Sequence, residues 1–245
     1  MRGFNTGVSP ALSVTDLGRL AYEPAFREQT LAHERVLAAR GSGAPVAGEL
    51  LLVEHDPVVT ISNRASAESN LLASPELLAK SGVAVARTDR GGDITYHGPG
   101  QLVAYPILDL NVLNLGLHDY MRLLEETVIA VCSEFGVETT RDPGATGVWT
   151  VRDGKPHAKI AAMGVRVRKW ISMHGLAINV STNLEHFRLI VPCGLVGRPV
   201  TSLRQELGDS SPGMAHVSAS LVRTMRCQLE AQAARATAAR AAATD

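Results

Sequence analysis

The sequence predicts an α+β fold in which a mixed, largely antiparallel sheet is flanked by helices. Short apolar runs of strand length outnumber the helical patterns, and some of them are joined as hairpins. The 245 residues contain no internal repeat and no linker-like segment, which favours a single domain. We expect residues 1–20 to be a loose lead-in, residues 21–233 to form the domain, and the alanine-rich residues 234–245 to be a disordered tail.

The first half of the chain alternates helical and strand patterns. Between Tyr22 and Arg40, apolar residues recur at three- and four-residue spacing, which predicts a helix that Gly41-Ser42-Gly43 ends. Ser74-Pro75 starts a short helix, because serine is a good N-cap and proline suits the first helical position. Apolar runs of strand length lie at residues 49–54, 58–61, 83–88 and 102–108.

The second half begins with the strongest helical pattern, from Leu117 to Phe135, whose apolar stripe marks Cys132 as a core residue. Asp153-Gly154 predicts a hairpin turn between a strand at residues 147–151 and a return arm. That arm passes through Lys159 and continues as a strand at residues 165–171. The elements expected after it are a strand at residues 176–180, a short helix at 183–189, a helix that a capping box starts at residue 202, and a last helix from 218 to about 233.

Composition and charge narrow the classes of function. Lys and Arg total 24 and Asp and Glu total 24, so the chain lacks the basic excess typical of a general nucleic-acid binder. No apolar run approaches the roughly 20 residues needed to span a bilayer, and no signal peptide is visible. Three widely spaced cysteines without a CxxC pair are poor material for a disulfide framework. We therefore expect a cytoplasmic protein that binds neither nucleic acid nor membrane.

A glycine-rich stretch between residues 90 and 101 is the first candidate for a site. Its glycines allow tight turns and a close approach of a ligand, and Arg90 and His97 offer charge and hydrogen bonds. The spacing matches neither GxGxxG at the start of a helix nor a P-loop, so a nucleotide site is not indicated. From composition alone, a pocket for a polar or anionic acyl carrier and a plain glycine-rich hairpin are equally good interpretations.

Cys193 and Lys159 are the second candidate. The attacking form of a cysteine is its thiolate, and the unperturbed thiol pKa is about 8.5, so a nearby ammonium group would help to form it. Pro192 and Gly194 suggest that Cys193 lies in a constrained, exposed turn. From this residue alone, a loop cysteine without a catalytic role is the favoured interpretation, and His174 is an alternative base. The histidines have no HxxH or HExxH spacing, so no metal site and no cofactor are predicted.

Several motifs, taken together and in order, resemble the octanoyltransferases of the lipoate pathway. The resemblance extends over roughly residues 20–208. The matching motifs are Arg90-Gly91-Gly92, Thr95-Tyr96-His97-Gly98-Pro99-Gly100-Gln101-Leu102-Val103, Lys159-Ile160, Gly175-Leu176-Ala177-Ile178-Asn179-Val180, Pro192-Cys193-Gly194 and Val200-Thr201-Ser202-Leu203.

This resemblance implies a fold, a reaction and partners. The fold is that of biotin and lipoate protein ligases, with residues 21–233 as a single catalytic acyltransferase domain. An octanoyl group would pass from octanoyl-acyl carrier protein to Cys193, and from there to a lysine ε-amine. The acceptors would be the lipoyl domains of 2-oxoacid dehydrogenase E2 subunits and the H protein of glycine cleavage. Neither ATP nor another cofactor is implied.

The resemblance also assigns roles to residues. Cys193 would be the acyl-thioester nucleophile, and Lys159 would lower its pKa and carry protons. The substrate-contact residues implied in this way are Arg90, Gly91, Gly92, Asp93, Ile94, Thr95, Tyr96, His97, Ala162, Met163, Gly164, Gly175, Leu176 and Ala177. The chain departs from the family pattern at Ser62-Asn63, where Leu-Gly is frequent, and at Asn183, where an aspartate is usual.

Two other functions fit parts of the pattern. An ATP-dependent lipoate–protein ligase would share the fold and a lysine at position 159, but it would not need Cys193. A non-catalytic module that binds acyl carriers or lipoyl domains would leave both residues without a task. Product formation from octanoyl carrier protein without ATP separates the transferase from the ligase.

Overall fold

The computed structural model describes residues 11–42, 46–191 and 197–242. Its strands are β1 (Ala11–Leu20), β2 (Val46–His55), β3 (Val58–Ser62), β4 (Ala84–Thr88), β5 (Ile94–His97), β6 (Gln101–Leu108), β7 (Thr139–Asp142), β8 (Ala145–Arg152), β9 (Lys155–Arg168) and β10 (Ile171–Asn179). Its α-helices are α1 (Tyr22–Ser42), α2 (Pro75–Lys80), α3 (Leu117–Glu134), α4 (Leu203–Leu207) and α5 (Met214–Ala242). Short 3₁₀ segments cover Glu68–Asn70, Leu184–Leu189 and Gly208–Ser210.

The described strands form two sheets. The larger has the order β1-β2-β6-β10-β9-β8-β7, and the smaller has the order β4-β3-β5. Only two strand pairs, β1 with β2 and β3 with β4, are parallel among those that the described residues form. This arrangement confirms the predicted mixed, largely antiparallel sheet.

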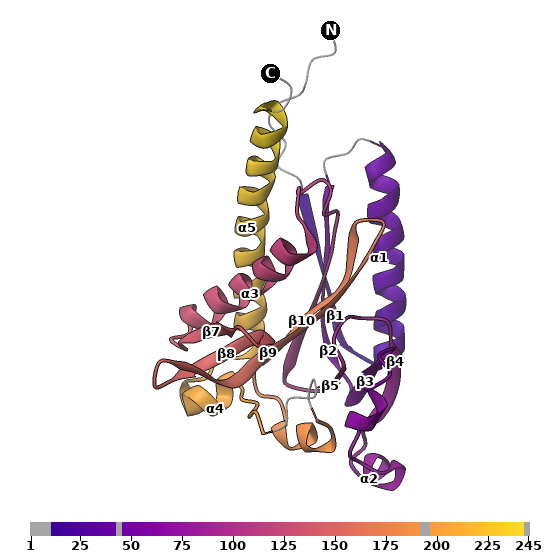
Figure 1. The fold of residues 1–245 in the computed structure, drawn as a ribbon, viewed down its shortest axis with the longest axis vertical. Coiled ribbons are helices and arrows are strands. Elements are labelled where there is room, and N and C mark those ends of the chain that lie inside the picture. Colours follow the sequence, from indigo (N-terminus) through magenta and orange to yellow (C-terminus); the bar gives the residue numbers. More distant parts are fainter. Residues whose placement is uncertain (1–10, 43–45, 192–196, 243–245) are drawn as a thin grey trace.

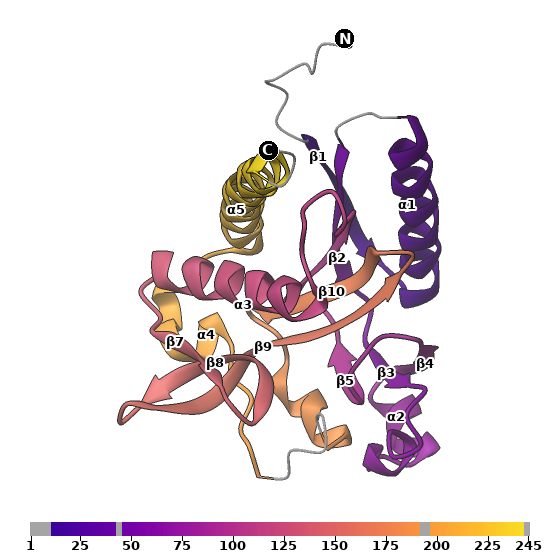
Figure 2. The ribbon, with the colours of Figure 1, turned by 45° about the horizontal axis from the view of Figure 1, so that its top comes forward.

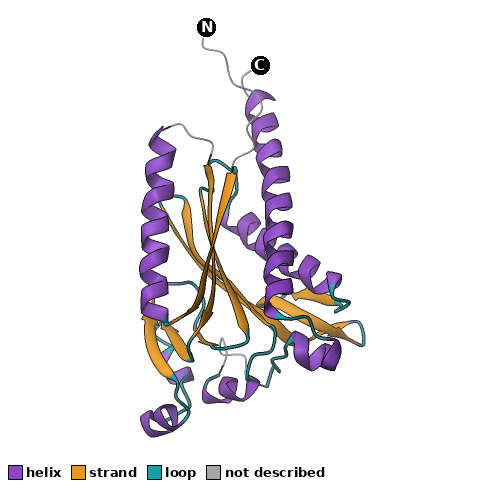
Figure 3. Ribbon diagram, turned by 180° about the vertical axis from the view of Figure 1, so that it is seen from behind, coloured by secondary structure: helices purple, strands orange, loops and turns teal. Residues whose placement is uncertain are grey.

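Helices cover both faces of the larger sheet. Alternate residues of β2 show why: Leu51 and Val53 pack with α1, whereas Leu50 and Leu52 pack with α3 and α5. Figure 1 shows α1 and α5 on opposite sides of the sheet, and the turned view in Figure 2 shows α3 on the side of α5. The same layering is visible from behind in Figure 3. Successive side chains of a strand point to opposite faces of the sheet, so the core is split into two parts, one under each helix layer.

The smaller sheet has an apolar cluster of its own. Ile94 and Tyr96 of β5 are fully buried in it, together with Phe187 and Leu189 of the 3₁₀ segment at Leu184–Leu189. The cluster also contains Val59, Ile61, Leu78 and Ile190. This cluster holds β5 against β3 and the 3₁₀ segment at Leu184–Leu189.

Residues 11–20 form a strand, which corrects the prediction of a loose lead-in for that part of the chain. Leu12 packs with the α3 and α5 layer, yet Leu20, an even number of residues later, packs with the α1 layer. A bulge between Asp16 and Arg19, with Gly18 at φ +62°, accounts for this change of face. A bulge breaks the alternation of apolar residues, so the pattern that identifies a strand is missing from the sequence. Residues 1–10 lie outside the described residues.

The alanine-rich tail is helical as far as Ala242, which corrects the predicted disorder of residues 234–242. Ala236 is buried, and Gln232 and Arg240 donate side-chain hydrogen bonds to the carbonyls of Leu113 and Asn111 at 2.9 and 2.7 Å. Alanine has the highest helix propensity of all residues, and these two anchors keep the extended helix on the body. Residues 243–245 lie outside the described residues.

The strand expected at residues 165–171 is interrupted by a tight turn. Lys169 and Trp170 have φ of +53° and +59°, and they connect β9 to β10. The usual signal for such a turn is Asn-Gly or Asp-Gly, and neither is present here. Tertiary contacts hold the turn instead, because Arg40 and Leu110 donate hydrogen bonds to the carbonyls of Lys169 and Trp170.

None of the helices within the described ranges combines the length and the apolarity needed to cross a membrane.

Candidate functional site

Lys159 lies in the first half of β9 and is 7% exposed. Its backbone N–H donates to the carbonyl of Pro199 at 2.9 Å, and its own carbonyl accepts from the N–H of Thr201 at 2.9 Å. The segment at residues 199–201 therefore runs alongside β9 and fixes the backbone on both sides of the lysine. The Lys159 ammonium nitrogen lies 4.8 Å from the centre of the Trp149 ring, within the range of a cation–π interaction.

Gly147 provides the space that the Lys159 side chain occupies. A Cβ atom on Gly147 would lie 2.6 Å from the Ala161 carbonyl oxygen and 3.3 Å from Cε of Lys159. The glycine also has φ +124°, which side chains rarely allow. The Gly147-Val148-Trp149 segment of β8 therefore holds the lysine at two points. Gly147 leaves room for the Lys159 methylene groups, and Trp149 offers its ring to the ammonium group.

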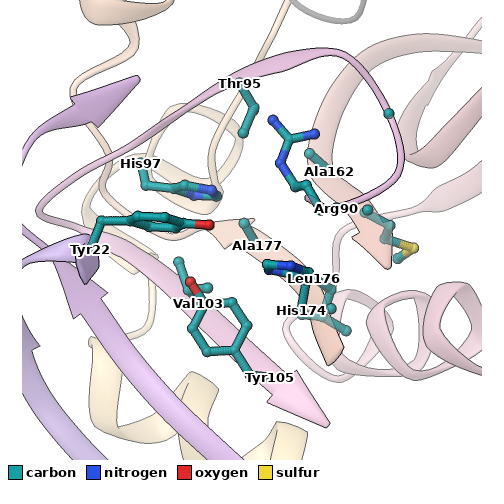
Figure 4. Close-up of a pocket in the computed structure, with 14 residues that line it drawn as sticks. Tyr22, Arg90, Thr95, His97, Val103, Tyr105, Ala162, His174, Leu176 and Ala177 are labelled. Carbon is teal, nitrogen blue, oxygen red and sulfur yellow. The ribbon is translucent and has the colours of Figure 1, made fainter. Parts of the chain in front are cut away.

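A pocket lies next to Lys159, between the start of α1, the small sheet and strands β6, β9 and β10. Figure 4 shows polar side chains from several of these elements around it. Its lining consists of Tyr22, Arg90, Gly92, Thr95, His97, Val103, Tyr105, Ala162, Met163, Gly164, His174, Gly175, Leu176 and Ala177. Three of these residues, Thr95, Ala162 and Ala177, also line the smaller cavity that Lys159 borders. The lysine thus lies beside the pocket, with small residues between them.

The loop before β5 is held against β9. The N–H of Gly91 donates to the Val165 carbonyl at 2.9 Å, and a Cβ on Gly164 would lie only 2.5 Å from the Gly91 carbonyl oxygen. Arg90 donates to the Thr60 carbonyl and hydroxyl at 3.0 Å each. Glycine at position 164 is needed for this close approach, and the contact positions the Arg90 guanidinium at the pocket (Figure 4).

A chain of side-chain amides connects the pocket to the strand of Lys159. The Thr201 carbonyl can only accept, so the group that donates to it at 2.9 Å is Nδ2 of Asn179. Oδ1 of Asn179 then accepts from Nε2 of Gln101 at 2.9 Å. Gln101 then directs Oε1 to Nδ1 of His97 at 2.6 Å. This order fixes the imidazole with its proton on Nδ1 and leaves Nε2 as an acceptor. Since Thr201 also bonds to Lys159, His97 and Lys159 belong to one hydrogen-bonded framework.

Burial keeps the imidazole of His97 neutral. Loss of hydration lowers the pKa of His97 to about 3, and the neighbouring His55 contributes in the same direction. The ring is therefore uncharged at neutral pH, and its Nε2 offers a lone pair at the pocket.

His174 reaches the pocket through an unusual backbone conformation. It has φ +58° in the middle of β10, and its N–H donates to Oε1 of Gln29 on α1 at 2.9 Å. Its Nε2 bonds to Oδ1 of Asp89 at 2.8 Å, and its ring stacks on Phe26. Burial, together with the positive charges of Arg90 and Arg166, lowers the pKa of His174 to about 3. His174 is thus a second neutral imidazole at the pocket.

Comparison with known proteins decides the family. The family model for the lipoyl protein ligase A/B catalytic domain matches residues 27–226. The chain belongs to this family. A protein of Koribacter versatilis named octanoyltransferase is 47% identical over 201 residues, which cover 81% of this chain and 77% of the relative. An octanoyltransferase of Bacteroides fragilis is 44% identical over 215 residues, covering 88% of this chain and 96% of the relative.

The family's fold is also found among solved structures. A bipartite lipoate protein ligase from Thermoplasma acidophilum has a TM-score of 0.64 and 19% identity, and the match covers 94% of this chain and 91% of that one. This likeness confirms the predicted lipoate-ligase-like architecture.

In this member of the lipoyl protein ligase A/B family, most of the predicted substrate-contact residues meet at one pocket. Those that line it are Arg90, Gly92, Thr95, His97, Ala162, Met163, Gly164, Gly175, Leu176 and Ala177. Four others do not. Ile94 and Tyr96 alternate to the other face of β5, where they are buried in the small-sheet cluster. Gly91 bonds to β9, and the side chain of Asp93 accepts from Asn70 at 2.9 Å.

Three further pocket residues were not expected from the sequence. The Tyr22 hydroxyl donates to Thr88 at 2.7 Å, and the Tyr105 hydroxyl bonds to His55 at 2.6 Å. Val103 is the third. Tyr22 shares the apolar stripe of α1, and Tyr105 and Val103 lie in the apolar run at residues 102–108, so no pattern distinguishes them from core residues.

The predicted nucleophile, Cys193, lies outside the described residues. The chain that leads to it is anchored, since Val191 donates its N–H to the Asn70 carbonyl at 2.7 Å. Of the other two cysteines, Cys132 is buried, as predicted, and burial raises its pKa to about 12. Cys227 is exposed on α5. Within the described residues, no three His, Cys, Asp or Glu side chains are grouped to hold a metal ion.

Proposed function

We propose that this chain transfers an octanoyl group from octanoyl-acyl carrier protein, through a thioester on Cys193, to a lysine ε-amine of a lipoyl domain. The observation that carries the proposal is the buried Lys159 beside a pocket lined by the segments expected to contact substrate. The names of relatives at 44 and 47% identity support octanoyl transfer as the reaction.

The pocket suits an acyl chain along part of its wall. Val103, Met163 and Leu176 give apolar surface, and the alanines and glycines of β9 and β10 keep that wall recessed. Each buried CH₂ group contributes about 0.8 kcal/mol, so the depth of the slot can select chain length. We propose that the acyl carbonyl lies at the Lys159 end and that the chain extends past Ala162 and Ala177 into the pocket.

The first chemical step exchanges one thioester for another. The Cys193 thiolate attacks the acyl carbonyl carbon, a new carbon–sulfur bond forms, and the carbon–sulfur bond to the carrier breaks. The carrier sulfur leaves as a thiolate and takes a proton from the Lys159 ammonium, which leaves Lys159 neutral for the next step. Because one sulfur replaces another, the step is close to thermoneutral and needs no ATP. Lys159 supports it by favouring the thiolate over the thiol.

The second step forms an amide. The acceptor amine attacks the acyl carbon, the bond to Cys193 breaks, and the amine loses a proton, for which Lys159 is the base. Conversion of a thioester to an amide is downhill, so this step also proceeds without ATP. We propose the lipoyl domains of 2-oxoacid dehydrogenase E2 subunits and the glycine cleavage H protein as acceptors.

Intact mass spectrometry tests the covalent intermediate. The chain is incubated with octanoyl carrier protein and no acceptor, and we expect a mass increase of one octanoyl group. The adduct should be cleaved by hydroxylamine and should be absent in Cys193→Ala. Cys227→Ala serves as the matched control and should be acylated normally. An unmodified wild-type chain, or an adduct that persists in Cys193→Ala, contradicts the proposal.

A further inference from the structure

Two positive charges share the ring of Trp149. The guanidinium carbon of Arg198 lies 4.1 Å from the ring centre, and the Lys159 ammonium lies 4.8 Å from the same point. The two charges are therefore no farther apart than the sum of these distances. Trp149 is 1% exposed, and its indole N–H donates to the Ala145 carbonyl at 3.2 Å, so the ring is a fixed surface.

Arg198 is held at this ring by a carboxylate. Its Nη2 donates to Oδ2 of Asp142 at 2.5 Å, and the other carboxylate oxygen accepts from the N–H of Gly144 at 2.8 Å. The side chains of Arg198 and Asp142 are 34% and 12% exposed. Because the carboxylate is itself fixed by the turn after β7, the guanidinium has one defined position.

We propose that Arg198 is a positioning residue whose permanent charge, fixed by Asp142 over Trp149, sets the pH at which Lys159 loses its own charge. Arginine is not deprotonated in proteins, and a like charge nearby disfavours the charged form of an amine. The Trp149 ring and the Asp142 carboxylate act in the opposite direction, because both favour a cation. The consequence for catalysis rests on the function proposed above for Lys159.

The other charged groups near this part of β9 have partners of their own. Glu125 of α3, whose carboxylate accepts from the N–H of Gly147, is paired with Arg122 and Arg141. Glu206 of α4 accepts from the Thr201 hydroxyl. Of the charged side chains that the structure describes around Lys159, Arg198 is the one that lies over the same Trp149 ring. Neutral His97 faces the adjoining pocket.

The test reads the charge of Lys159 directly. The chain has four lysines, Lys80, Lys155, Lys159 and Lys169, so reductive methylation with ¹³C-formaldehyde gives few side-chain NMR signals, and Lys159→Arg assigns the relevant one. In Arg198→Gln we expect its titration midpoint to move to higher pH by on the order of one pH unit. In Asp142→Asn, which leaves the arginine charge uncompensated, the midpoint should move to lower pH.

A matched control uses another arginine that pairs with an aspartate. Arg204 bonds to Asp209 at 3.0 Å on the surface, and Arg204→Gln should leave the Lys159 midpoint unchanged. Equal midpoints in wild type and Arg198→Gln, or shifts of the same sign in Arg198→Gln and Asp142→Asn, overturn the inference.

Transfer by the unmodified proteins is measured separately against pH. The rising limb of the rate profile should move in the same directions as the NMR midpoints. If the NMR midpoints move but the rate profile does not, the charge relationship stands, and the role proposed for Lys159 in transfer fails. The two proposals can therefore fail independently.

Discussion

The carbonyl of Lys159 accepts a hydrogen bond from the backbone N–H of Thr201 at 2.9 Å, although 42 positions separate the two residues. The Thr201 carbonyl in turn accepts from Asn179, so the lysine, the central strand β10 and the pocket histidine His97 are connected through backbone and amide groups. This connection explains how distant motifs act as one site.

Removal of the Lys159 ammonium should abolish most of the transfer activity. Lys159→Met keeps an unbranched stem in the space above Gly147 but loses the base and the positive charge. We expect the octanoyl transfer rate to fall by about 10²–10⁴-fold, as for loss of a general base. Lys155→Met, at the exposed start of the same strand, should retain the wild-type rate. A Lys159→Met rate near that of the control would remove this residue from the mechanism.

Asn179→Asp should lower both the stability of the fold and the rate of transfer. A carboxylate cannot donate to the Thr201 carbonyl, so two acceptors would face each other in a buried position. We expect a loss of about 1–3 kcal/mol in the free energy of unfolding, together with slower transfer. Asn183→Asp is the control, because the Asn183 side chain accepts from the Glu185 N–H and aspartate does the same. Urea unfolding of both variants measures the difference, and equal stabilities would disprove the argument.

Acid should destabilise the fold through the pocket histidines. The pKa values of His97 and His174 are lowered to about 3, whereas unfolded histidine titrates near 6.5. Above pH ~6.5 these histidines are neutral in both the folded and the unfolded protein. Below that pH they bind protons in the unfolded protein but stay neutral in the folded protein. Stability should therefore decline as the pH falls from ~6.5 toward 3, by up to about 1.4 kcal/mol per pH unit for each histidine. Urea unfolding of His97→Gln across this range should show a smaller slope than wild type; an equal slope would contradict the assignment.

Gly147 should be replaceable by alanine only with loss of activity. The added Cβ would lie 2.6 Å from the Ala161 carbonyl oxygen and 3.3 Å from Cε of Lys159, so β8 or the lysine must move. Gly136→Ala is the control, because Gly136 also has a positive φ, +78°, but has open space around it. We expect transfer to fall in Gly147→Ala and to persist in Gly136→Ala. Equal rates in the two variants would mean that the gap above Gly147 has no role.

Part of the fold can be predicted from the sequence, because β2, β3 and β6 coincide with apolar runs of strand length and α3 coincides with an apolar helical stripe. The failures occur where local geometry breaks the pattern. The bulge at Gly18 interrupts the apolar alternation that would identify β1 as a strand. The Lys169-Trp170 turn contains no glycine, so no turn is predicted there. The alanine tail is helical because anchors far away in the sequence hold it.

The site, like the fold, could be predicted only in part. The ordered motifs around Arg90, Lys159 and Gly175 predicted most of the pocket lining. The position of Arg198 on Trp149 was not predictable, because it depends on the return of the chain over a distant hairpin. The arrival of His174 depends on a positive φ that its sequence context does not indicate.

The central claim is that octanoyl transfer uses a thioester donor and needs no ATP. The most direct measurement mixes octanoyl carrier protein, a lipoyl domain and the chain without nucleotide, and follows the mass of the lipoyl domain. We predict that the domain gains one octanoyl group on its lysine and that Cys193→Ala forms no product. A domain that is modified only when free octanoate and ATP are supplied would contradict the account and identify a ligase.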